Sequence, residues 1–108
     1  LSPVSLIPSM RTMFKPAKAA GLRMRIGFEV AGESFLAALA NGELPIRRGH
    51  AAQGQAIFRA PNASVIAGLL YAHVPVEQLE VEAGLSIAGD RALALRYAGL
   101  FALPAKLA

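Results

Sequence analysis

The chain has 108 residues, no cysteine and a formal net charge of +4, and 55% of its residues are hydrophobic. This length predicts one domain, because a chain of this size buries roughly two thirds of its unfolded surface in a single core. The lack of cysteine excludes disulfides and thiolate chemistry, and no apolar run approaches the roughly 18 residues that span a bilayer. With no recognisable signal peptide, we expect a cytoplasmic protein.

The first expected element is a helix. Leu6, Met10 and Phe14 recur at helical spacing, and Ser2 is placed to cap the helix. Because proline lacks the backbone donor, we expect a kink at Pro8 or a helix that starts only near it, ending before residues 15–16.

A sheet follows. Residues 22–30 alternate between apolar and polar, which predicts a strand with Arg23 and Arg25 on the face opposite the apolar one. Strands over 34–40 and 43–48, joined by an Asn41-Gly42 turn, complete an antiparallel meander. No aromatic residues interleave with the arginines, so a solvated face is favoured over a nucleic-acid surface, and a weak contact with an anionic membrane stays open.

The second half predicts a strand at 55–59, a helix capped by Asn62 and running to about residue 72, and a short turn from Pro75 to Glu82. A fifth strand at 85–87 then leads to a last helix.

Asp90 caps that last helix. Because the helix is apolar nearly all round, we expect it to be buried on more than one side.

The expected fold class is α+β, with a five-stranded, largely antiparallel sheet covered by helices. We expect residues 1–108 to form one domain, with a lead-in helix and linker at 1–21 and a core at 22–103. Since the first residue is Leu, this domain is expected to be a piece of a longer chain.

Candidate catalytic groups are isolated. A capping role is favoured for Asp90, and His50 and His73 lie far apart with no second ligand at helical spacing. The serines lack a nucleophile-elbow context, and no glycine-rich phosphate loop is present. We therefore expect no enzyme, no metal and no cofactor.

The stronger candidate site is apolar. These apolar residues have two possible interpretations, a plain core or a cavity that holds an apolar small molecule. Leu95 and Leu103, on the other side of the last helix, are candidates for a homodimer contact. The candidate cavity residues are Met24, Ile26 and Phe28 on the sheet and Ile66, Leu70, Tyr97, Leu100 and Phe101 beyond it.

Residues 22–101 resemble the sterol carrier protein type-two domain. The resemblance rests on diffuse glycine and hydrophobic positions, such as Gly32-Glu33 with Phe35, Asn41-Gly42-Glu43-Leu44, and Leu85-Ser86-Ile87-Ala88-Gly89-Asp90 before Leu100-Phe101. It implies a five-stranded sheet covered by helices, a tunnel for lipids or other apolar molecules, and no catalytic set.

The opening residues 1–6 and the segment 14–22 resemble the version found C-terminal in HxlR-type winged-helix transcription regulators. This implies a ligand-sensing, regulatory domain, with DNA bound only by a winged helix outside these residues. A stand-alone lipid carrier and a dimerisation module without ligand are the alternatives.

Overall fold

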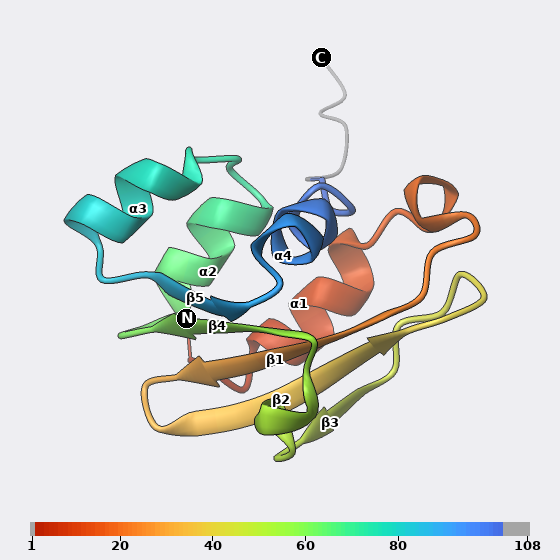
Figure 1. Cartoon of the computed structure of the whole chain (residues 1–108), viewed down its shortest axis with the longest axis horizontal. Coiled ribbons are helices and arrows are strands. Elements are labelled where there is room, and N and C mark those ends of the chain that lie inside the picture. The colour runs from red at the N-terminus through yellow and green to blue at the C-terminus, as the bar shows by residue number, and fades with distance from the viewer. Residues whose placement is uncertain (1, 103–108) are drawn as a thin grey trace.

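The computed structural model describes residues 2–102, and its centre is a five-stranded sheet in the order β3-β2-β1-β4-β5 (Figure 1). Helices α1, α2 and α4 lie over one face of this sheet, and α3 lies outside α2. The α+β class and the number of strands are as predicted. The elements are α1 (Leu6–Met13), η1 (Pro16–Ala19), β1 (Met24–Val30), β2 (Glu33–Leu39), β3 (Ile46–Arg48), η2 (Ala51–Gln53), β4 (Ala56–Ala60), α2 (Ala63–Leu70), α3 (Val76–Glu82), β5 (Ser86–Gly89) and α4 (Arg91–Ala98).

The central strand β1 has neighbours on both sides. It pairs antiparallel with β2, where Phe28 faces Phe35, and parallel with β4, where Phe28 faces Phe58. The β2–β3 and β4–β5 pairs are antiparallel, so the sheet is mixed but largely antiparallel as expected. The period-two pattern of β1 is confirmed, since Arg25 is exposed while Met24 and Ile26 are buried.

The hairpin between β2 and β3 has the predicted Asn41-Gly42 turn. Both residues have positive φ, 53° and 73°, and Ala40 and Glu43 form a bridge across the turn. The predicted third strand was too long, because β3 begins at Ile46 rather than at residue 43. Pro45 has no backbone N–H to donate to a strand partner.

Helix α1 begins close to Pro8 and ends before residue 15, as expected. Pro8 stands at the third helical position, where a backbone N–H would have no partner within the helix, so proline fits there. Ser2 does not cap α1 directly: its Oγ accepts from the Ser5 N–H, at 3.3 Å, in the turn before the helix. The lead-in helix packs into the same core as the rest of the domain, because Leu6 and Met10 are fully buried.

Two predicted caps are present. The Asn62 side chain accepts from the Val65 N–H at 3.2 Å at the start of α2, and Asp90 accepts from the Leu93 N–H at 3.0 Å at the start of α4. Helix α2 ends at Leu70, slightly before the predicted end at about residue 72.

The expectation that α4 is buried on more than one side is wrong. Ala94, Tyr97 and Ala98 face the core, but Arg91, Ala92, Leu95 and Arg96 are exposed. The helix has one buried face because its two arginines, Arg91 and Arg96, lie on the outer side, where their charges stay in water. Arg91 instead donates two hydrogen bonds, of 2.6 and 2.7 Å, to Glu80 of α3 and lowers the pKa of that carboxyl.

The segment between β3 and β4 crosses the other face of the sheet through η2, in front of β1 and β2 in Figure 1. Its backbone approaches β1 so closely that a Cβ on Gly27 would lie 2.1 Å from the carbonyl oxygen of Ala51. Gln55 continues this attachment, since its N–H donates to Arg25 at 2.8 Å and its carbonyl accepts from Asp90 at 2.9 Å. Glycine at position 27 is therefore required by the crossover.

We expect Gly27→Ala to lower the free energy of unfolding by about 1 to 3 kcal/mol, because the new methyl group must displace backbone rather than a flexible side chain. Gly68→Ala in α2 is the matched control. A Cβ there meets only Val74 Cγ2 at 3.7 Å, so alanine should raise stability by about 0.5 to 1 kcal/mol through its helix propensity. Urea unfolding of both variants measures the difference, and equal effects would contradict the close approach.

Candidate functional site

The structure brings the eight predicted cavity residues into one core between the sheet and its helices. Met24 and Leu100 are each 3% exposed, and the other six are fully buried. Their side chains contact one another in this arrangement, so whether they also open to hold a ligand stays a prediction. Of the predicted homodimer contacts, Leu95 is 38% exposed and Leu103 lies outside the described residues.

Aromatic rings connect the sheet to α4. The ring centroid of Phe28 lies 5.0 Å from that of Phe35, 5.4 Å from that of Phe58 and 5.8 Å from that of Tyr97. Tyr97 then lies 5.1 Å from Phe101. These separations are typical of favourable aromatic pairs, and the five rings form a continuous apolar surface under the helices.

The hydroxyl of Tyr97 is enclosed in this core. It donates a hydrogen bond to the thioether Sδ of Met10 in α1, at 3.2 Å. Burial raises the pKa of Tyr97 well above its usual value, so the hydroxyl stays neutral and remains a donor. The sequence analysis placed Met10 only on the buried stripe of a helix, because nothing in the sequence connects it to a residue 87 positions away.

A second side-chain hydrogen bond, between two hydroxyl groups, joins α1 to the end of α2. Ser9 Oγ and the Tyr71 hydroxyl lie 2.6 Å apart, and the Tyr71 ring centroid is 6.2 Å from that of Phe101. Burial raises the pKa of Tyr71, and the hydrogen bond to Ser9 opposes that shift. Sequence analysis missed this pair because serine and tyrosine carried no motif.

The C-terminal end of α1 is fixed by backbone hydrogen bonds. The Lys15 N–H donates to the Leu100 carbonyl at 2.9 Å, the Ala102 N–H donates to the Met13 carbonyl at 3.2 Å, and Phe14 and Phe101 form a bridge. The rest of α1 meets the core through side chains such as Leu6 and Met10. Helix α1 thus has its backbone hydrogen bonds to the rest of the domain at its C-terminal end, and side chains, including the Ser9–Tyr71 and Met10–Tyr97 pairs, hold the remainder.

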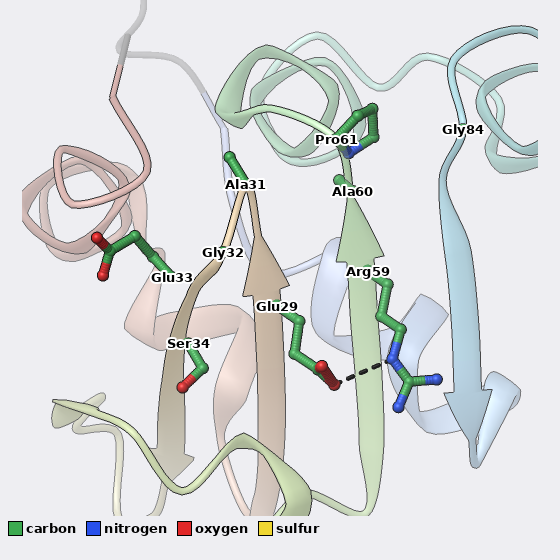
Figure 2. Close-up of a pocket in the computed structure, with 9 residues that line it drawn as sticks. All are labelled: Glu29, Ala31, Gly32, Glu33, Ser34, Arg59, Ala60, Pro61 and Gly84. Carbon is green, nitrogen blue, oxygen red and sulfur yellow. Dashed lines mark hydrogen bonds and ion pairs between the residues drawn. The ribbon is translucent and has the colours of Figure 1, made fainter.

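Of three surface hollows in the described part of the chain, one is lined by a predicted cavity residue, Met24. The largest, of about 460 Å³, lies between the β1–β2 turn and the start of α2 (Figure 2). Glu29 and Arg59 form an ion pair of 3.0 Å inside it, and Ser34 lies across from Glu29 on β2. Both ion-pair side chains are more than 40% exposed, so this pair is solvated and adds little stability. Much of the remaining lining is apolar, with Ala31, Ala60 and Pro61.

The other polar candidates are not gathered into a reactive set. His50 and His73 are both exposed and occupy turn positions with φ of 60° and 52°. Within residues 2–102, no group of three or more histidine, aspartate or glutamate side chains could hold a metal ion. None of the helices described is long and apolar enough to cross a membrane.

We expect Phe101→Ala to lower the free energy of unfolding by about 3 to 5 kcal/mol, because the ring is fully buried between Phe14, Tyr71 and Tyr97. Leu95→Ala, at an exposed position of α4, should cost less than about 1 kcal/mol. Chemical denaturation reports both values. A small loss for Phe101→Ala would mean that its surroundings do not depend on the ring.

We expect stability to fall at alkaline pH. The pKa of Tyr97 is about 10 when the chain is unfolded and is raised in the fold, so its full contribution is present below pH 10. Above pH 10 only the unfolded state ionises, and stability should be lost at about 1.4 kcal/mol per pH unit until the folded pKa is reached. Tyr97→Phe should flatten this decline, which denaturant unfolding between pH 8 and about 11 measures; parallel declines in both proteins would contradict it.

Comparison with known proteins places the fold. No family model matches the chain, and no curated protein sequence matches it. Among solved structures, the stereoselective inverting sec-alkylsulfatase Pisa1 from Pseudomonas sp. superposes with a TM-score of 0.83 at 16% identity, over 97% of this chain and 17% of Pisa1. The chain thus spans about a sixth of that enzyme's length.

A second structure, the ubiquinone synthesis protein UbiJ-SCP2, superposes with a TM-score of 0.69 at 17% identity. This match covers 90% of both chains, so the two domains correspond nearly end to end. Together with the mixed five-stranded sheet and its helices, it shows that this chain has an SCP2-like fold.

Proposed function

We propose that this domain binds an apolar small molecule, a lipid, fatty acyl or sterol-like compound, between its sheet and helices, and that it has no catalytic activity of its own. The observation that carries the proposal is the character of the interior. Among residues 2–102, every buried side chain of the core is hydrophobic, and the aromatic surface from Phe28 to Phe101 lies beneath α1, whose backbone hydrogen bonds to the rest of the domain lie at its C-terminal end. Such a site recognises its ligand by burying hydrocarbon.

Binding requires side chains to move, because they occupy the space in this structure. Met10 and Met24 are suited to this, since methionine is unbranched and repacks easily. Helix α1 presents Met10 to the core and keeps backbone hydrogen bonds at its C-terminal end. We propose that the N-terminal part of α1 lifts to admit the ligand, which requires the Ser9–Tyr71 hydrogen bond to break and Leu6 to leave the core.

The comparisons support the ligand class. SCP2-like domains typically bind lipids, and the domain of this fold in Pisa1 is part of an enzyme named for alkyl sulfates. Both facts favour a compound with a hydrocarbon chain, and neither identifies it.

Native mass spectrometry of the purified domain is the direct test. We expect an extra mass that is lost on denaturation, either carried through purification or gained when a long-chain alcohol or fatty acid is added. A clean monomer that takes up no added lipid would contradict ligand binding. A clean dimer with no lipid would favour the dimerisation alternative.

Leu70→Trp tests where the ligand lies. Leu70 is fully buried on α2, and an indole there takes up ligand space. If the interior opens, we expect ligand uptake to be lost with a melting temperature within a few degrees of the wild type. Val81→Trp, at a position 86% exposed on α3, is the matched control and should bind as the wild type does. Unfolding by Leu70→Trp would contradict an opening at that position.

We further propose that the domain works as a regulatory half of a transcription regulator, with DNA bound by a winged helix outside these residues. The support is the resemblance of residues 1–6 and 14–22 described above. A winged helix encoded directly upstream would favour this role, whereas an upstream enzyme domain would favour an arrangement like that of Pisa1. A stand-alone carrier would instead use its exposed arginines, such as Arg23, Arg25 and Arg47, at an anionic membrane.

A further inference from the structure

Tyr97 is the only residue of the buried core, among residues 2–102, that carries a hydroxyl group. It lies where the aromatic surface, α4 and α1 meet, with Phe28, Phe58 and Phe101 around its ring. Phenylalanine would fill the same volume without a polar atom to satisfy. Burying the hydroxyl in this interior therefore costs free energy unless a hydrogen-bond partner replaces its lost contact with water.

The partner that it has is weak. A thioether sulfur accepts a hydrogen bond poorly, and Met10 Sδ is the acceptor at 3.2 Å. An oxygen atom would be a stronger acceptor for the hydroxyl. In a buried site the difference in hydrogen-bond energy is large, because the local dielectric constant is low. Met10 sits on the helix that we propose lifts for ligand entry, so its sulfur leaves the hydroxyl when the site opens.

We infer that the ligand carries an oxygen atom, and that the Tyr97 hydroxyl donates a hydrogen bond to this oxygen in place of Met10 Sδ. This inference rests on the proposed function, and it assigns the hydrogen-bond donor that recognises the oxygen of such a ligand. The hydrocarbon part would lie against Phe28 and Phe101.

The oxygen is expected to be neutral. No charged side chain is buried among the described residues, so a carboxylate in this core would have no counter-ion. Burial also keeps the Tyr97 hydroxyl in its neutral, donating form. An ester, ketone or alcohol therefore suits the site better than a fatty acid anion.

The test compares three probes of equal chain length, dodecane, 2-dodecanone and dodecanoate, measured by displacement of an apolar fluorescent dye. The wild type should prefer the ketone to dodecanoate at neutral pH. Tyr97→Phe should weaken the ketone by about 2- to 10-fold, the range of one net hydrogen bond, and leave dodecane unchanged. Met10→Leu, which removes the competing sulfur at similar volume, should raise the affinity for the ketone relative to that for dodecane, since any effect on repacking acts on both probes.

The outcomes separate the two proposals. If the wild type binds the probes but Tyr97→Phe changes ketone and dodecane equally, or changes neither, the hydroxyl inference is wrong and lipid binding stands. If the wild type binds none of the probes, both are wrong. The melting temperature of Tyr97→Phe without ligand confirms that the variant is folded, since the ring and its packing are retained.

Discussion

The parallel pairing of β1 with β4 is the constraint on which the rest of the structure depends. To place β4 beside β1, the chain must cross the sheet after β3, and it does so on the face opposite the helices. The crossing is possible because Gly27 has no side chain to hold η2 away. With β4 in place, Phe58 stands beside Phe28, and the aromatic surface that receives α4 is complete.

The two faces of the sheet also differ in the polarity of their side chains. The helix-covered face is apolar at its centre and carries the Glu33–Arg48 ion pair at its edge, whereas the other face carries Arg25, Glu29 and Arg59 in contact with solvent. The largest of the three hollows described above contains the Glu29–Arg59 ion pair of this polar side (Figure 2). The proposed ligand would enter from the helix side, where α1 covers the apolar core.

Within that apolar interior, Tyr97 is an exception that packing does not require. Its ring contributes to the core as phenylalanine would, but its hydroxyl has only a sulfur acceptor. Natural cores tolerate such a group when a partner compensates for its desolvation. A bound oxygen, as proposed above, would supply a better partner. In this structure the same hydroxyl connects α4 to α1 through Met10.

Local signals in the sequence determined much of the fold. Period-two alternation located β1, the Asn41-Gly42 pair located the hairpin, and Asn62 and Asp90 located two helix starts, because each of these features acts through neighbouring backbone atoms. The buried set was also predicted, since apolar residues at regular spacing must face inward.

Tertiary structure decided what depends on distant partners. The single buried face of α4 was misjudged because composition does not reveal which side of a helix meets the sheet. The close approach of Gly27 to Ala51, and the meeting of Tyr97 with Met10 across 87 positions, arise only when the crossover and the helices are in place. Sequence by itself determined an apolar interior in an α+β domain, and the fold decided where in that interior one polar atom lies, because side-chain neighbours are set by packing rather than by order along the chain.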